Sequence, residues 1–79
     1  MELKDTAGMM SSPDYKERFK AEYYQLKIRY EKLTAMLANW DHLDFNPTCP
    51  KDLLEQQADI MYNYMKLLEN RAQIENVTL

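Results

Sequence analysis

The chain has almost none of the residues that stabilise small proteins through covalent bonds or bound metal. Its 79 residues include one cysteine, Cys49, so no disulfide can form within the chain, and a lone thiol is typical of a reducing cytoplasm. The single histidine, His42, lies near Asp41 and Asp44 in a segment more typical of a solvated turn than of a metal site. We therefore expect no metal and no cofactor, and a fold stabilised by helix packing and self-association.

Glycine, proline and long apolar runs are also scarce. One glycine and three prolines are too few for a β protein with many turns. No apolar run approaches the roughly 20 residues of a membrane-spanning helix, and the N-terminus lacks the basic and apolar segments of a signal peptide. These absences predict a soluble, cytoplasmic, helical protein that contacts no membrane.

Catalytic motifs are missing as well. The sequence contains no serine elbow, no cysteine–histidine pair, no glycine-rich phosphate loop and no metal-ligand spacing. We therefore expect the protein not to be an enzyme. The formal net charge of −3 argues against long nucleic acid as a partner, because a polymer would be repelled everywhere outside a small basic patch.

Two long amphipathic patterns occupy most of the chain. The first helix is expected over residues 13–40, with Ser12 as its N-cap and Pro13 as its first residue. A loop over 41–49 contains Pro47, and a second helix over 50–76 begins at Pro50. The apolar residues of the first helix recur in steps of three and four, which is typical of a coiled-coil-like seam: Tyr15, Phe19, Tyr23, Leu26, Tyr30, Leu33, Leu37 and Trp40.

The second helix carries two adjacent seams, whereas a simple hairpin needs only one. The first seam consists of Leu53, Gln57, Ile60, Tyr64, Leu67, Arg71 and Ile74. The second seam consists of Leu54, Ala58, Met61, Met65, Leu68 and Ala72. The doubled face predicts further burial, most simply against another copy of the chain. The alternative is a broad face that accommodates the first helix together with the N-terminal segment.

These patterns predict an all-α fold. Matched helix lengths and a short connection favour an antiparallel two-helix hairpin over residues 13–79, with a short N-terminal helix or arm over 1–12. A chain of this size has a marginal core, so we expect the hairpin to assemble as a homo-oligomer.

Positive charge is concentrated on the first helix. From Tyr15 to Lys32 there are six Lys/Arg and three Glu, a local balance of +3, so the rest of the chain carries −6. On a helix, Lys16, Lys20 and Lys27 share one edge of the apolar stripe, bracketed by tyrosine rings. Lysines that cover the rim of an apolar stripe explain the same pattern without any ligand. A local positive patch with stacking surfaces nevertheless favours a small phosphorylated ligand over a polymer.

The stretches "SPDYKERFKAEYYQLKIRYEKL", "NPTCP" and "LLEQQADIMYNYMKLLENRAQIE" resemble small hairpin proteins of phages and prophages. These are similar to the family of anti-CBASS cyclic-oligonucleotide sponges and Thoeris inhibitors. The resemblance implies two helices per protomer in compact oligomers, often hexamers. It also implies that the protein sequesters cyclic di- or trinucleotides, or cyclised ADP-ribose signals, without cleaving them in the host bacterial cytoplasm.

The resemblance also implies candidate ligand-binding residues. A tyrosine near the start of the long helix stacks on a base and a lysine further along meets phosphate, and Tyr15 and Lys27 match these positions best. Lys16, Arg18 and Phe19 are neighbours that could complete the pocket. Arg71, an arginine on an apolar seam, could belong to a second site for larger cyclic ligands at a symmetry axis.

The leading hypothesis is thus a non-enzymatic sponge for cyclic nucleotide signals. The alternative is a structural or adaptor protein that binds a protein partner through the face formed by Met61, Met65 and Leu68. A single-stranded nucleic-acid binder ranks last because the chain is acidic.

Overall fold

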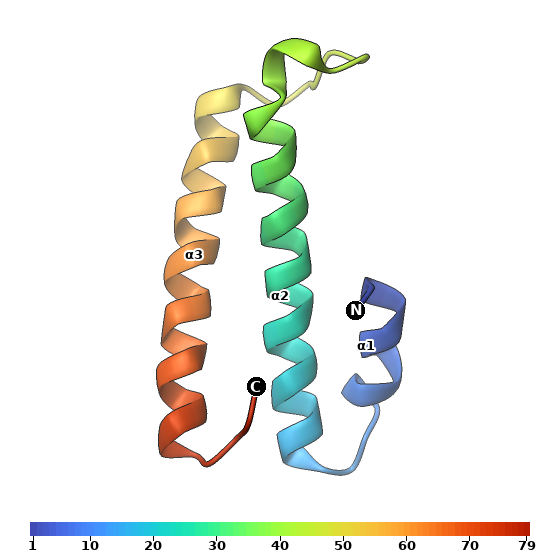
Figure 1. The fold of residues 1–79 in the computed structure, drawn as a ribbon, viewed down its shortest axis with the longest axis vertical. Helices are drawn as coiled ribbons and strands as arrows, with labels where there is room; N and C mark the ends of the chain where they lie inside the picture. Colours follow the sequence, from blue (N-terminus) through green and yellow to red (C-terminus); the bar gives the residue numbers. More distant parts are fainter.

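The computed structural model describes all 79 residues, and all of its secondary-structure elements are helices. A short helix α1 (Leu3–Met10) precedes a long helix α2 (Tyr15–Ala38), a 3₁₀ turn η1 (Trp40–His42) and a second long helix α3 (Lys51–Ile74). Figure 1 shows α2 and α3 side by side and antiparallel, with α1 on the opposite flank of α2. The predicted all-α hairpin with a short N-terminal helix is confirmed. None of these helices is both long enough and apolar enough to span a membrane.

Both long helices begin differently from the prediction. The N-cap of α2 is Asp14, whose carboxylate accepts a hydrogen bond from the backbone N–H of Lys16 at 2.9 Å, so the assignment of Ser12 as N-cap was wrong. Ser12 lies two residues before Asp14, and its hydroxyl accepts a hydrogen bond from the Asp14 backbone N–H at 3.1 Å. Pro50 is the N-cap of α3 and not its first helical residue, because its ψ of 146° is extended while its carbonyl already accepts from the Leu54 N–H. A carboxylate closer to the first turn satisfies the free amides better than the more distant hydroxyl.

The main core lies between α2 and α3, at the end of the hairpin away from the loop. It is a single cluster of buried side chains: Phe19, Tyr23, Met65, Leu68, Ala72 and Val77. Leu68 is fully buried, whereas Tyr15, which has the same periodicity as Phe19 and Tyr23, is 45% exposed. The seam of α2 is therefore only partly covered by α3.

The end of α3 folds the chain back onto this core. Asn76 adopts a left-handed conformation with φ of 59°, and the N–H of Val77 donates to the carbonyl of Ala72 at 2.8 Å. This is the hydrogen-bond pattern of a Schellman cap, in which asparagine tolerates the left-handed position. As a result Val77 is buried against the core and completes it.

Helix α1 packs on α2 through small and polar side chains. Thr6 is fully buried; its hydroxyl donates to the carbonyl of Leu3 at 2.6 Å and accepts from the side-chain amide of Gln25 at 2.9 Å. Ala21 on α2 is also fully buried. This side of α2 faces away from α3, so α1 covers no part of α3 (Figure 1).

The two seams of α3 have different environments. The inner seam, from Leu54 to Ala72, is buried or half-buried against α2. Every residue of the outer seam, from Leu53 to Ile74, is exposed, and two of them, Tyr64 and Arg71, also contact α2 through the ends of their side chains. Because α1 lies on the far side of α2, the explanation of the doubled face by the N-terminal segment was wrong. The adaptor face predicted around Met61, Met65 and Leu68 was also misplaced, since Met65 and Leu68 are buried in the hairpin.

Candidate functional site

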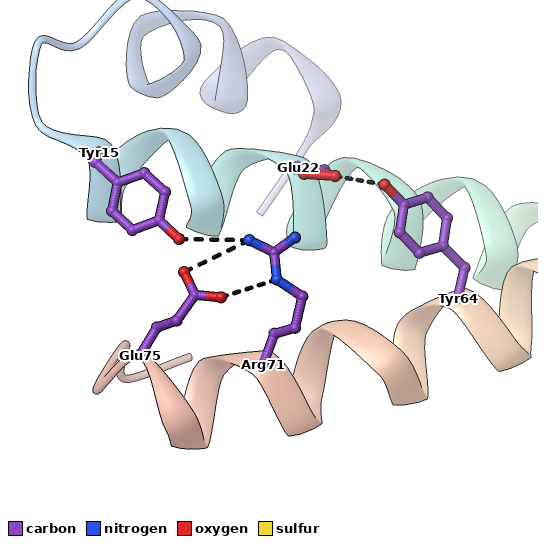
Figure 2. Close-up of polar contacts among 5 residues, drawn as sticks. All are labelled: Tyr15, Glu22, Tyr64, Arg71 and Glu75. Carbon is purple, nitrogen blue, oxygen red and sulfur yellow. Dashed lines mark hydrogen bonds and ion pairs between the residues drawn. The ribbon is translucent and has the colours of Figure 1, made fainter.

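The candidate site lies where α2 begins and α3 ends, around the guanidinium of Arg71. Its Nε donates to Glu75 at 2.8 Å and its Nη2 lies 3.4 Å from the hydroxyl of Tyr15. The guanidinium carbon lies over the ring of Phe19, 4.9 Å from the ring centroid. Figure 2 shows Arg71 extending from α3, with its guanidinium joined by dashed lines to the Tyr15 hydroxyl of α2 and to the carboxylate of Glu75. The rings of Tyr15 and Phe19 meet edge to face, with centroids 6.3 Å apart.

Local sequence explains this geometry. Arg71 and Glu75 are four residues apart on a helix, which is the spacing at which an ion pair spans one turn. Tyr15 and Phe19 have the same spacing on α2 and present adjacent rings. Because α2 and α3 are antiparallel, the last turn of α3 lies against the first turn of α2, and the two pairs meet.

The Arg71 guanidinium is held in place but remains accessible. The side chain of Arg71 is 45% exposed and that of Glu75 is 27% exposed. The Nη1 group of Arg71 has no hydrogen-bond partner within the chain. An oriented guanidinium with a free donor group, next to the half-exposed ring of Tyr15, is suited to an anion that carries a planar ring system.

Two tyrosine–glutamate pairs link α2 and α3 beyond this cluster. Tyr64 donates to Glu22, and this hydrogen bond, together with burial, raises the pKa of Tyr64, while the charge of Arg71 acts in the opposite direction. Tyr23 donates to Glu69 at 2.7 Å. Burial and the Glu69 carboxylate raise the pKa of Tyr23 to about 12, and the same hydrogen bond lowers the pKa of Glu69. Both phenols are thus held as neutral donors that join the helices.

The structure brings together three of the six predicted ligand-binding residues. Tyr15, Phe19 and Arg71 form one cluster within a single chain, although Arg71 was assigned by resemblance to a second site. Lys27 lies three turns along α2, about 18 Å from Tyr15 at 1.5 Å per residue. There it lines a hollow of about 190 Å³ with Met1, Tyr24, Ile28 and Glu31.

Two further predicted residues lie near the cluster without contacting Arg71. The Nη1 of Arg18 donates to the carbonyl of Ser12 at 2.9 Å, which anchors the turn before α2. The side chain of Lys16 is exposed on the first turn of α2. The sequence reasoning missed Glu75 as the partner of Arg71, although their spacing of four residues is visible in the sequence.

The chemistry available here is binding through charge and stacking. The groups around Arg71 are the phenol of Tyr15, the phenyl ring of Phe19 and the carboxylate of Glu75, and no group of three or more His, Cys, Asp or Glu side chains lies close enough to hold a metal ion. Neither curated proteins nor solved structures give a match to the chain. A family model described as Sequestin matches residues 13–74, which contain both long helices and the loop between them. The chain therefore belongs to the Sequestin family.

Proposed function

We propose that this protein binds and sequesters a small phosphorylated immune signal, a cyclic di- or trinucleotide or a cyclised ADP-ribose, and does not cleave it. In this proposal it acts as a phage-type anti-defence sponge in the cytoplasm of the host bacterium. The name of the family supports sequestration of a ligand, and the resemblance to sponge-type hairpins supports this class of ligand. The observation that carries the proposal is the contact of the Arg71 guanidinium with both Tyr15 and Phe19.

Each part of such a ligand has a counterpart in the cluster. A phosphate accepts hydrogen bonds from the free Nη1 of Arg71, which presents a planar array of donors. A base of the ligand, which is adenine in cyclised ADP-ribose, stacks on the exposed ring of Tyr15, since aromatic stacking tolerates different bases. Glu75 occupies one edge of the guanidinium, so an incoming phosphate competes with this carboxylate.

The proposal includes assembly of several copies. The cluster lies on the open surface of a thin hairpin with principal extents of 42 × 24 × 16 Å, so a single copy provides only one wall of a pocket. Ligand sites usually bury most of a small ligand. A second copy can supply another wall, and Lys27, Lys16 and Arg18 can contribute to a shared site from different copies.

The proposal predicts stoichiometric binding without turnover. Calorimetry with a panel of cyclic di- and trinucleotides and cyclised ADP-ribose should give saturable heat for at least one compound. Substituting Arg71→Ala should remove most of that heat. The matched control is Arg29→Ala, which deletes an exposed arginine of α2 outside the cluster and should leave binding unchanged. Ligand released by denaturation should have its original mass.

Two results would contradict the proposal. The absence of heat with every compound at micromolar protein would exclude sequestration of these signals, and capture of a protein partner would then support the adaptor function. Recovery of a cleaved ligand would show that the protein is an enzyme.

A further inference from the structure

The outer seam of α3 has the spacing of a coiled-coil interface. Its seven positions follow steps of 4, 3, 4, 3, 4 and 3, an average of 3.5 residues, which is the repeat at which two helices pack along a shared seam. All seven residues are exposed, and five of the ten exposed large hydrophobic residues of the chain lie on this seam: Leu53, Ile60, Tyr64, Leu67 and Ile74. The seam is about 32 Å long at 1.5 Å per residue.

The residues beside the seam allow an identical helix to approach. One flank is the inner seam, which already packs on α2. The other flank carries Gln56, Asn63 and Asn70, three uncharged amides at heptad spacing. Flanking positions of coiled coils usually carry charges that select partners, and like charges there repel identical copies. A flank of amides imposes no such repulsion, so the charge pattern fits a second copy of this chain.

The seam is symmetric about Tyr64 when two copies run antiparallel. In that register Leu53 faces Ile74 of the second copy and Ile60 faces Leu67 of the second copy. Gln57 faces Arg71 of the second copy. A parallel register would place Arg71 against Arg71, and like charges at an interface are unfavourable. Antiparallel helices also align their dipoles favourably.

We infer that two copies pair antiparallel through the outer seam of α3, and that each pair builds two ligand sites to which both copies contribute. Arg71 belongs both to this seam and to the cluster with Tyr15 and Phe19. The second copy therefore covers the open side of the cluster and places the Gln57 amide beside the guanidinium. A hollow of about 370 Å³ lined by Leu53, Gln56, Gln57, Ile60 and Met61 receives the end of the second copy's α3. The pairing specifies which helix face joins two copies in the proposed assembly. The shared site rests, in addition, on the proposed ligand-binding function.

Disulfide cross-linking tests the pairing and its direction without any ligand. In a Cys49→Ser background, the single variants Leu53→Cys and Ile74→Cys are purified, mixed and oxidised. The antiparallel register predicts a cross-link between the two variants and none within either variant alone, because identical positions lie about 30 Å apart at 1.5 Å per residue. Self-cross-linking of each variant would overturn the antiparallel register. No cross-link in any sample would overturn the pairing.

A second measurement tests whether the seam drives assembly. Leu67→Glu places a charge in the centre of the seam and should reduce the native mass to that of a smaller species, with helix content unchanged because Leu67 is 56% exposed. Gln73→Glu adds the same charge at an exposed position outside the seam and should leave the native mass unchanged. A wild-type protein that is monomeric, or that uses this seam for a different protein, would overturn the inference.

Calorimetry separates the failure of this inference from the failure of the proposed function. If Leu67→Glu dissociates the pair, its ligand affinity should fall at least tenfold, because each site loses the wall from the second copy. Full affinity in a single-copy variant would overturn the shared site and leave the proposed function intact. An antiparallel pair that binds no compound would contradict the function and leave the pairing intact.

Discussion

The guanidinium of Arg71 lies over the ring of Phe19, with its central carbon 4.9 Å from the ring centroid. This contact joins the last turn of α3 to the second turn of α2, and a cation–π contact at such a site contributes about 0.5–1 kcal/mol. It also fixes the plane of the guanidinium, while Glu75 binds one of its edges at 2.8 Å. The cation of the candidate site is therefore preoriented and partly neutralised before any ligand arrives.

Removing the competing carboxylate should strengthen anion binding. Glu75→Gln keeps the shape of the side chain and removes its charge, so Arg71 should meet a phosphate with less competition. An exposed ion pair contributes up to about 1 kcal/mol, which corresponds to a rise in affinity of up to about fivefold. Calorimetry measures this change, and Glu55→Gln, at the far end of α3, is the control with the same change in net charge. Weaker binding in Glu75→Gln would show that Glu75 contacts the ligand directly.

The Tyr23–Glu69 pair should make the hairpin sensitive to alkaline pH. The pKa of Tyr23 rises from an ordinary 10.0 to about 12 in the folded chain, so folded Tyr23 holds its proton where unfolded Tyr23 loses it. The free energy of unfolding should therefore fall as the pH rises from 10 to 12, and the contribution of Tyr23 should be complete below pH 10. Urea denaturation followed by circular dichroism at several pH values measures this loss.

The variant Tyr23→Phe isolates that contribution. It should be less stable than the wild type at neutral pH, because it loses the hydrogen bond to Glu69, and its stability should fall less between pH 10 and 12. The variant should also lose less stability in acid, since the Tyr23 hydrogen bond lowers the pKa of Glu69. Tyr62→Phe, at an exposed ring, is the control. An identical alkaline profile in Tyr23→Phe and wild type would assign the transition to other groups.

Two adjacent leucines should have opposite roles. Leu68 is fully buried between the helices, so Leu68→Ala should reduce the free energy of unfolding by about 2–5 kcal/mol at any protein concentration. Leu67 is 56% exposed on the outer seam, so Leu67→Ala should reduce stability by an amount that depends on protein concentration. Denaturation curves at several concentrations distinguish the two. A concentration-independent loss in Leu67→Ala would indicate a role within the single chain.

The turn after α3 should depend on the residue at position 76. Asn76 has a positive φ of 59°, which glycine adopts freely and alanine does not. Asn76→Ala should therefore reduce the free energy of unfolding by about 1 kcal/mol, whereas Asn76→Gly should leave it nearly unchanged. Denaturant midpoints of the two variants measure the difference. Equal midpoints would mean that burial of Val77 does not require this turn.

Periodicity predicted the helices well and their ends poorly. The spacing of Tyr15, Phe19 and Tyr23 reflects the geometry of one helix, which depends on local backbone bonds. The N-cap of α2 depended on which of two neighbouring polar groups reached the first turn, and Asp14 did so in place of Ser12. The 45% exposure of Tyr15 was also not predictable, because it depends on how far α3 extends along α2.

The candidate site was predicted only in part, because it too depends on how α3 packs against α2. Tyr15, Phe19 and Arg71 were each identified, but their assignment to two sites was based on resemblance and not on distance. Glu75 was visible at helical spacing from Arg71, yet its importance appears only when the guanidinium is seen to lie over the ring of Phe19 while Glu75 binds its edge. Contacts between residues 52 positions apart in the chain require the tertiary structure.

The sequence by itself determined the two long helices, the loop between them and the two seams of α3, because helical periodicity is a local property of the chain. Only the tertiary structure decided that the seam of Leu68 faces α2 and that the apolar residues of the outer seam around Leu67 face outward. It also placed Arg71 beside Tyr15 and Phe19. The physical reason is that the choice between two adjacent apolar faces depends on packing volume and on the rotation of one helix against another, which no local pattern specifies.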